Sequence, residues 1–230
     1  MEINLNLESE DCAKINKSEI AYDQIKAMIV SGNIKQGAPI KEMELSKLLG
    51  LSRTPIREAL RLLETENFVH STPNKGVCAA KLSSVDASEI LEARIGIETY
   101  AAKLCIGKPD SLVLETLKKS VEAQEEMVKR YDYLSFALYD KMFHRTIVEG
   151  SKNSRLIAFW NTLMDHTQMI MNVVFSTKHN IALSVNVHKE LLQLIEDGNE
   201  TMACSLLHEH IGSMREDIAR ILLLTDTAGQ

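Results

Sequence analysis

Apolar residues recur at helical spacing along most of the chain after Leu82, and short polar or glycine-containing segments interrupt them. This pattern predicts long helices joined by short connections. The expected helices span residues 85–106, 109–131, 132–149, 153–176, 182–197 and 199–224. Six helices with short connections are typical of an antiparallel bundle, so we expect an all-α domain over residues 83–230.

The segment before Leu82 has a different pattern, with shorter amphipathic stretches. Residues 43–49 predict a short helix that ends at Gly50. A second helix is expected to follow at once, because Ser52 or Thr54 can cap it and Pro55 suits its first turn. Its apolar face consists of Ile56, Ala59, Leu60 and Leu63. Two helices joined by a tight glycine-containing turn predict a helix-turn-helix unit.

Two β-prone runs follow this second helix. Residues 62–69 close the helix and lead into a short strand, and residues 71–79 supply a turn and a second strand. The sequence Pro73-Asn-Lys-Gly76 is typical of a hairpin tip. The expected fold is therefore mainly α, with an N-terminal winged helix-turn-helix and a C-terminal all-α antiparallel bundle of about six helices.

Arg53, Arg57 and Arg61 lie on one face of the second helix, because they are spaced four residues apart. In a major groove, Arg53 and Arg57 would contact guanines and Arg61 would meet a phosphate. The other candidate DNA contacts are Ser52 and Thr54 at the helix start and Lys75 and Gly76 at the wing tip. The alternative is a solvated face with the ion pairs Arg57–Glu58 and Arg61–Glu64. The turn, the proline, the arginines and the basic wing tip, in this order, favour DNA binding.

The distribution of charge agrees with a DNA-binding module at the N-terminal side. The whole chain carries a net charge of −6. Residues 12–82 hold eleven Lys and Arg against seven Asp and Glu, whereas residues 83–230 hold fifteen against twenty-one. A module with so small an excess of positive charge makes few phosphate contacts. We therefore expect salt-dependent binding of a homodimer to a palindromic operator in double-stranded DNA.

The composition indicates neither a membrane protein nor a disulfide-rich secreted one. No run of about 18 apolar residues is present. The acidic segment 1–11 lacks the basic and apolar regions of a signal peptide, so we expect a cytoplasmic protein. The four cysteines, at positions 12, 78, 105 and 204, show no paired spacing and are expected to be reduced. Cys105 and Cys204 fall on apolar helical faces and are expected in the core.

The N-terminal motif resembles that of a known family. The run Leu51-Ser-Arg-Thr-Pro-Ile-Arg-Glu-Ala-Leu-Arg61, with Pro73-Asn-Lys-Gly76 about a dozen residues later, is similar to the DNA-binding domain of GntR-family bacterial transcription regulators. The resemblance covers residues 16–82. We accordingly expect a disordered tail at residues 1–15, the DNA-binding domain at 16–82 and an effector-binding and dimerisation domain at 83–230.

Four polar residues lie on apolar helical faces of the second domain. Asp140 and His144 project within the same stripe as Phe136, Phe143 and Ile147. His188 and His210 lie on the apolar faces of the last two helices, whereas His208 projects to solvent, His166 falls beside its apolar stripe and His179 lies in a loop. Four groups that can bind a metal are therefore directed at the core.

A metal ion would resolve the cost of burying these groups. A buried carboxylate is unfavourable unless it is paired, and Asp140 and His144, four residues apart, can bind one ion from adjacent turns. Three neutral imidazoles and one carboxylate suit a divalent transition metal: Zn²⁺, Ni²⁺, Co²⁺, Mn²⁺ or Fe²⁺. The alternative is a hydrogen-bonded Asp–His network without metal.

The same residues carry a second resemblance. Asp140-Lys-Met-Phe-His144, followed by Gly150-Ser-Lys-Asn153, His188, Asp197-Gly-Asn199 and His210, resembles the metal-binding form of the FCD effector domain in the FadR subfamily of GntR regulators. The resemblance implies that Asp140, His144, His188 and His210 bind the metal. It also implies a small carboxylate effector at open metal positions, with Arg94 as the candidate clamp. The alternative for Arg94 is a surface ion pair with Glu98.

These observations predict a transcription regulator rather than an enzyme. Effector binding in the bundle would change the arrangement of two winged helices on the operator, with a hinge around residues 80–86. Repression is what the family implies. The first alternative is a metal sensor, in which the ion itself is the signal. The second is a metal-dependent enzyme, which would leave the winged helix unexplained and would lack a separate nucleophile.

Overall fold

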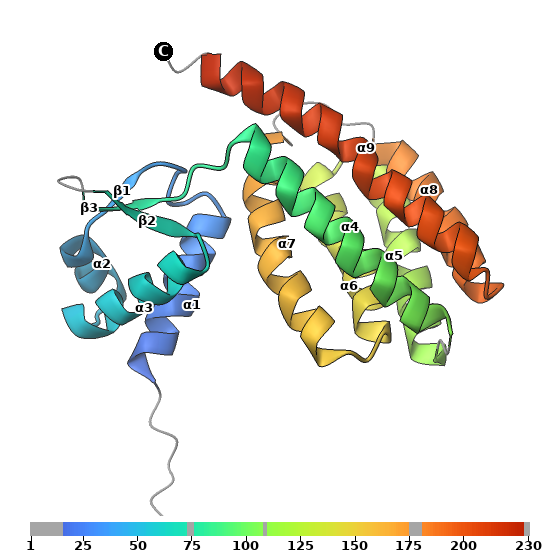
Figure 1. Ribbon diagram of the computed structural model, residues 1–230, viewed down its shortest axis with the longest axis horizontal. Helices are drawn as coiled ribbons and strands as arrows, with labels where there is room; N and C mark the ends of the chain where they lie inside the picture. The colour runs from blue at the N-terminus through green and yellow to red at the C-terminus, as the bar shows by residue number, and fades with distance from the viewer. Residues whose placement is uncertain (1–15, 73–75, 108–109, 175–180, 228–230) are drawn as a thin grey trace, which may run out of the picture. The chain divides into compact units, whose positions relative to one another are not determined.

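The structure is a computed structural model that describes residues 16–72, 76–107, 110–174 and 181–227. The expected tail at residues 1–15 and the hairpin tip at Pro73–Lys75 lie outside these ranges. The chain divides into two compact units, with the main boundary between Ala80 and Lys81 and with Val30–Gly32 grouped with the second unit. Figure 1 labels the elements of both units.

In the first unit, the part of the chain that the structure describes forms three helices and a small sheet. Its elements are α1 (Lys17–Val30), β1 (Pro39–Ile40), α2 (Glu42–Leu49), α3 (Arg53–Thr65), β2 (Val69–Thr72) and β3 (Gly76–Ala79). The sheet has the order β1-β3-β2 with antiparallel pairs. The helix-turn-helix and the two wing strands are confirmed. The two-residue strand β1 was not expected, and Pro39 is tolerated there because β1 lies at the edge of the sheet.

The turn between α2 and α3 follows from two residues. Gly50 adopts a left-handed conformation with φ 65° and ends α2, because its N–H donates to the Ser46 carbonyl. Ser52 is the N-cap of α3 with extended backbone, although its hydroxyl makes no capping hydrogen bond. The expected apolar face of α3 is buried: Ile56, Ala59, Leu60 and Leu63 are at most 4 % exposed.

Helix α1 contacts the residues that follow the end of α3. Ile25 and Ile29 are buried, and the Tyr22 hydroxyl donates to the Glu66 carboxylate over 2.6 Å. Lys26 also donates to Glu66 and lies over the Phe68 ring, 4.7 Å from its centroid. These contacts leave the arginine-bearing face of α3 uncovered within the first unit.

The described residues of the second unit form six helices, as the sequence predicts. They are α4 (Ser84–Ile106), α5 (Ser111–Arg130), α6 (Tyr133–Gly150), α7 (Ser154–Val174), α8 (Ile181–Glu196) and α9 (Glu200–Thr227). Local sequence sets several ends: Ser83 and Asp86 form a capping box at α4, and the Asp110 and Asp132 side chains cap α5 and α6.

Helix α4 is central to this bundle. It packs against α6, α7 and α9, while α5 packs against α6 and α8. Figure 1 shows α4 and α9 running side by side. The fully buried side chains include Leu91, Leu117, Phe143 and Trp160. Among the described residues, no helix is long and apolar enough to cross a membrane.

Candidate functional site

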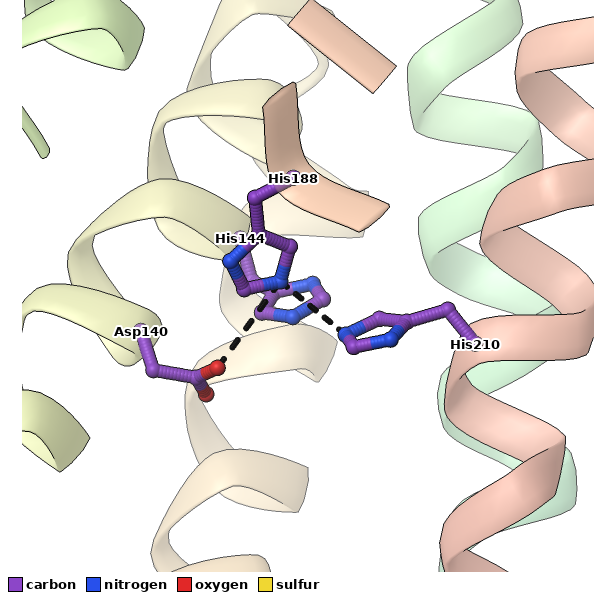
Figure 2. A group of neighbouring side chains, drawn as sticks. All are labelled: Asp140, His144, His188 and His210. Carbon is purple, nitrogen blue, oxygen red and sulfur yellow. Dashed lines mark hydrogen bonds and ion pairs between the residues drawn. The ribbon is translucent and has the colours of Figure 1, made fainter. Parts of the chain in front are cut away.

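Four side chains from three helices converge in the second unit. Asp140 and His144 lie one turn apart on α6, His188 lies on α8 and His210 on α9. Their ligand atoms all lie within 4.8 Å of one another (Figure 2). The His188 Nε2 is 3.0 Å from the His210 Nε2 and 3.8 Å from an Asp140 carboxylate oxygen. The structure therefore brings together all four residues that the sequence suggested as metal ligands.

The spacing of these atoms fits a single ion. Transition-metal bonds to imidazole and carboxylate are about 2.0–2.2 Å long, so opposite ligands lie roughly 4.0–4.4 Å apart. Small side-chain rotations would bring the four donor atoms, now within 4.8 Å, to that spacing. Four protein ligands would leave positions open on an ion that prefers six. The donor set and its spacing are thus compatible with a divalent transition metal.

The orientation of His144 is fixed by a carboxylate on α4. The His144 Nδ1 lies 2.6 Å from Glu98 Oε2, and both side chains are buried. An ionised carboxylate only accepts hydrogen bonds, so Nδ1 carries a proton, and in the neutral imidazole Nε2 then has the lone pair. That arrangement is common for imidazoles that bind metals, because the second partner sets the tautomer.

His188 is oriented in the same way by an amide on α5. The Gln124 Nε2 donates to the Tyr139 carbonyl over 3.1 Å, which directs the amide oxygen toward His188. That oxygen lies 2.6 Å from the His188 Nδ1, so Nδ1 is the donor. The His188 ring also stacks on Phe143 with centroids 4.3 Å apart. His188 therefore presents an Nε2 lone pair to the cluster.

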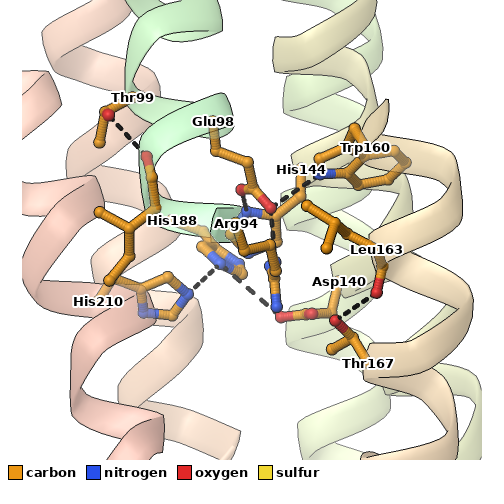
Figure 3. A network of polar contacts seen from close by, with 11 residues as sticks. Arg94, Glu98, Thr99, Asp140, His144, Trp160, Leu163, Thr167, His188 and His210 are labelled. Atoms are coloured by element: carbon orange, nitrogen blue, oxygen red, sulfur yellow. Dashed lines mark hydrogen bonds and ion pairs between the residues drawn. The ribbon is translucent and has the colours of Figure 1, made fainter. Parts of the chain in front are cut away.

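Arg94 lies inside the bundle, which corrects the alternative expectation that it forms an ion pair on the surface. It pairs with Glu98, as the alternative had it, but the pair is not on the surface: Arg94 is 2 % exposed and Glu98 is 0 % exposed. The Arg94 Nε donates to Glu98 Oε1 over 2.5 Å. Figure 3 shows this pair beside the histidine cluster.

Electrostatics favour an ionised Glu98 and a neutral His188. Burial opposes ionisation of Glu98, but Arg94 and His144 outweigh it and hold the pKa of this carboxyl well below its usual range. Burial lowers the pKa of His188 well below its ordinary value, and His210, His144 and Arg94 lower it further. Since the neutral imidazole is the form that binds a metal, the lowered pKa favours the form of His188 that can act as a ligand.

The sequence analysis missed the partners of the ligands. Glu98 was considered only as a surface partner of Arg94, and Gln124 was not considered. A signal existed for Glu98, because it falls on the helical stripe of Leu91, Ala102 and Cys105, which are all buried. A charged pair within such a stripe indicates a polar network in the core.

The remaining histidines and cysteines follow the expectations in part. His208 is exposed, as expected. His166, expected beside the apolar stripe, is 8 % exposed, and its Nδ1 lies 3.0 Å from the Thr162 carbonyl. His179 lies outside the described residues. Cys105 is buried as expected, whereas Cys204 is only partly buried.

The candidate DNA contacts are accessible on the first unit. Ser52, Arg53, Thr54, Arg57, Arg61 and Gly76 are exposed, and Lys75 lies outside the described residues. A groove of about 410 Å³ between α2, α3 and the wing strands is lined in part by Arg57, Arg61 and Ser71. Two of the three arginines thus border a hollow beside the wing.

The ion pairs on this face differ from those that the sequence suggested. The Arg57 Nε donates to both carboxylate oxygens of Glu42 on α2, at 2.9 and 2.8 Å. Glu58 instead accepts a hydrogen bond from the Ser18 hydroxyl, and Glu64 accepts one from the Ser71 N–H over 2.8 Å. Contacts between helices and the wing, rather than pairs along α3, therefore engage these carboxylates.

Comparison with known families assigns both units. Residues 17–78 match the family of bacterial regulatory proteins described as the gntR family, and residues 89–213 match the FCD domain. The FCD match alone covers more than half of the chain.

Curated relatives of the chain are transcription regulators. The HTH-type regulator YdhC of Bacillus subtilis (strain 168) is 27 % identical over 206 residues, covering 87 % of this chain and 90 % of its own length. The gluconate operon transcriptional repressor of the same organism is 23 % identical, covering 89 % and 85 %. The Glc operon transcriptional activator of Escherichia coli (strain K12) is 26 % identical, covering 71 % and 70 %.

Solved structures share the fold. E. coli McbR/YncC aligns with a TM-score of 0.77 at 18 % identity, covering 90 % of this chain and 98 % of that chain. The metal-free FCD domain of TM0439 aligns with a TM-score of 0.55 at 19 % identity, covering 63 % of this chain and 99 % of its own. The matched families and relatives are regulators and not enzymes, which confirms that expectation. The chain belongs to the GntR family of bacterial transcriptional regulators and carries an FCD domain as its second unit.

Proposed function

We propose that this regulator is a repressor of the FadR subfamily whose hold on a palindromic operator depends on a divalent transition metal and a small carboxylate effector in the FCD domain. The observation that carries the proposal is the convergence of the partly exposed Asp140 with the histidines at 144, 188 and 210, all within 4.8 Å, in a domain attached to a DNA-binding unit. The protein would act in the bacterial cytoplasm as a homodimer.

In this proposal α3 enters the major groove. Arg53 and Arg57 contact guanines, Ser52 and Thr54 contact bases or phosphates, and Arg61 meets a phosphate. Lys75 and Gly76 contact the backbone or the minor groove from the wing. The exposure of α3's arginines supports these roles, since the opposite face of α3 is buried in the first unit.

The metal would be held by the four converging side chains. When bound, the ion supplies positive charge and open coordination positions for an acid. The residues of the chain provide the rest: Glu98 and Gln124 keep two imidazoles in the ligand tautomer, and the neutral form of His188 is favoured. Arg94 is our candidate for the effector's carboxylate, because its contact with Glu98 uses Nε and a guanidinium has two further amino groups.

Control of DNA binding requires a difference in affinity. An effector shifts the regulator only if it binds the operator-competent and operator-incompetent arrangements unequally. The segment around residues 80–86, where the two units join, is our candidate hinge. Relatives named as a repressor and as an activator both exist, so repression is part of the proposal.

The recognition helix is tested by Arg57→Ala. This variant should lose operator retardation while it keeps its dimer and its metal content, because Arg57 is exposed and far along the chain from the metal ligands. Arg145→Ala, an exposed arginine on α6, is the matched control and should retain operator binding. Normal retardation by Arg57→Ala would overturn the assignment of α3.

The control site is tested by measuring operator affinity with Zn²⁺ alone, with Zn²⁺ plus gluconate and other small organic acids, and after chelation. The proposal expects the acid to change operator affinity only when the metal is present. A change caused by metal alone would instead establish a metal sensor. His144→Ala with His188→Ala should contain no bound metal by elemental analysis, and full metal content in this variant would overturn the ligand set.

A further inference from the structure

One buried carboxylate on α4 contacts three different side chains of the site. Glu98 is 0 % exposed. Its Oε1 accepts hydrogen bonds from the Arg94 Nε at 2.5 Å and from the Trp160 Nε1 at 2.8 Å. Its Oε2 accepts from the His144 Nδ1 at 2.6 Å (Figure 3). Glu98 therefore joins α4 to α6, which carries His144, and to α7, which carries Trp160.

The bond to His144 is not needed to balance charge. Arg94 already pairs with Glu98, and a buried ion pair alone gives little net stability compared with apolar residues of similar size. The additional bond determines which nitrogen of His144 faces the cluster. Since Nδ1 is taken by Glu98, the nitrogen left for Asp140 and His210 is Nε2.

We propose that Glu98 is a positioning residue for the metal centre: its carboxylate fixes His144 in the tautomer and orientation that present Nε2 to the ion, while Arg94 and Trp160 hold the carboxylate in place. This inference rests on the proposed metal site. It is separable from that site, because a metal can bind to the four ligands whether or not Glu98 contributes to its affinity.

The isosteric variant Glu98→Gln tests the proposal directly, because it should reverse the tautomer of His144. Two donors, Arg94 and Trp160, share Oε1, so the single oxygen of a glutamine amide would stay with them. The NH₂ group would then face His144 and could only donate, so Nδ1 would have to accept. The proton of His144 would move to Nε2, where it blocks metal binding.

The first measurement is the tautomer of His144 in the full-length, metal-free protein. Nitrogen-15 NMR of the imidazoles should show His144 protonated at Nδ1 in the wild type and at Nε2 in Glu98→Gln. The matched control is Trp160→Phe, which removes one bond to the same carboxylate but leaves His144 and Arg94 in contact with it. Its His144 should remain protonated at Nδ1. An unchanged tautomer in Glu98→Gln would overturn the proposal.

The second measurement is Zn²⁺ affinity by calorimetry. Loss of an outer partner of a metal-binding histidine typically costs about 10- to 100-fold in affinity, and we expect this loss in Glu98→Gln. Trp160→Phe should change the affinity by less than about threefold, since the tautomer is kept. Zn²⁺ binding by Glu98→Gln as tight as in the wild type would contradict the role of Glu98.

A double-mutant cycle distinguishes the positioning of His144 by Glu98 from a general structural effect of Glu98→Gln. In a His144→Ala background, Glu98→Gln should have no further effect on Zn²⁺ affinity, because the residue that it positions is gone. An equal loss in both backgrounds would mean a merely structural role and would overturn the proposal. If Glu98→Gln does not fold by circular dichroism, Arg94→Met with Glu98→Gln replaces it, because this pair leaves no unbalanced charge and predicts the same tautomer.

The proposed function and this inference fail in different ways. A wild-type protein that binds no Zn²⁺ would overturn the metal site itself. A wild-type protein that binds Zn²⁺, together with a Glu98→Gln variant of equal affinity, would overturn only the role of Glu98.

Discussion

At the scale of single residues, Arg57 already has a partner in the absence of DNA. Its Nε donates to both carboxylate oxygens of Glu42, although its side chain is 58 % exposed. A negative charge beside the proposed DNA-reading face weakens attraction to any phosphate backbone. The same contact restricts the rotamers of Arg57, which would help it to meet one base in a defined orientation.

Glu42→Gln should therefore change selectivity more than operator affinity. Removal of the charge should raise the affinity for DNA of scrambled sequence. The Arg57 side chain, with its rotamers no longer restricted by Glu42, should bind the guanine proposed for it less well. We expect the ratio of operator to scrambled affinity to fall roughly fivefold, about 1 kcal/mol of base discrimination. Fluorescence anisotropy with both duplexes at several salt concentrations measures this ratio.

Glu58→Gln is the matched control for that experiment. Glu58 lies next to Arg57 on α3 and is exposed, but its carboxylate accepts from the Ser18 hydroxyl. Glu58→Gln removes the same charge from the same helix-turn-helix unit, so it should raise both affinities together and leave their ratio unchanged. A ratio that falls equally in both variants would show that net charge, and not the contact with Arg57, is responsible.

The thiol of Cys105 should be almost unreactive in the folded protein. Burial, together with a smaller effect of the Asp110 carboxylate, raises its pKa to about 11. Only the thiolate attacks alkylating reagents, so its rate should increase about tenfold for each pH unit up to about pH 11. Mass-spectrometric mapping after iodoacetamide treatment at pH 8 should find Cys105 unmodified in native protein and modified in urea. Rapid modification at pH 8 without urea would contradict this.

Residues of the site that a local sequence pattern marks could be predicted, whereas residues that depend on contacts between distant helices could not. Asp140 and His144 stand out because helical projection is a local property of one segment. The partners that orient the imidazoles depend on contacts between distant helices: His144 and Glu98 are 46 positions apart, and His188 and Gln124 are 64 apart. No local pattern pairs such residues, so the candidate ligands and the burial of Glu98 were predictable from the sequence, whereas the pairing of His144 with Glu98 and of His188 with Gln124 was not.

At the scale of elements, long helices were predictable and the shortest strand was not. The ends of the six described helices of the bundle agree with the predicted ends to within three residues. The reason is that apolar periodicity and capping residues such as Asp110 and Asp132 are features of the local sequence. Strand β1 has two residues and exists through its pairing with Cys78 and Val77. Two residues are too few to show a period.

The crossing of α4 and α6 depends on a glycine. A Cβ at Gly150 would collide with the Cys105 Sγ, while the Cys105 Cβ and the Val113 Cγ1 would be 3.4 Å away. Gly150→Ala should therefore destabilise the protein by about 1–2 kcal/mol, because overpacking outweighs the gain in helix propensity. In the Cys105→Ala background the collision is removed and this loss should disappear. Urea unfolding of the four proteins measures the coupling.

Gly96→Ala provides the control for this cycle. A Cβ at Gly96, inside α4, would meet nothing within 4 Å. This substitution should stabilise the protein by about 0.5–1 kcal/mol, the usual difference between alanine and glycine in a helix interior. Equal effects of Gly96→Ala and Gly150→Ala would mean that helix propensity, and not packing against Cys105, decides the result.

At the scale of the whole molecule, the chain combines a DNA-binding unit of net positive charge with an FCD domain of net negative charge. The proposed metal ligands all belong to the second unit. The single tryptophan, Trp160, also belongs to that unit and bonds to Glu98. Tryptophan fluorescence therefore reports on the FCD domain, and circular dichroism reports on both units.

Metal should consequently stabilise the FCD domain selectively. A ligand that binds only the folded state adds about 2.7 kcal/mol of stability at 100 times its dissociation constant. Excess Zn²⁺ should raise the midpoint of the fluorescence-detected thermal transition, and chelation should reverse the shift. The variant with His144→Ala and His188→Ala should show no shift, because two of the four ligands are gone. A midpoint that rises equally in this variant would place the stabilising metal elsewhere on the protein and would contradict the site at Asp140, His144, His188 and His210.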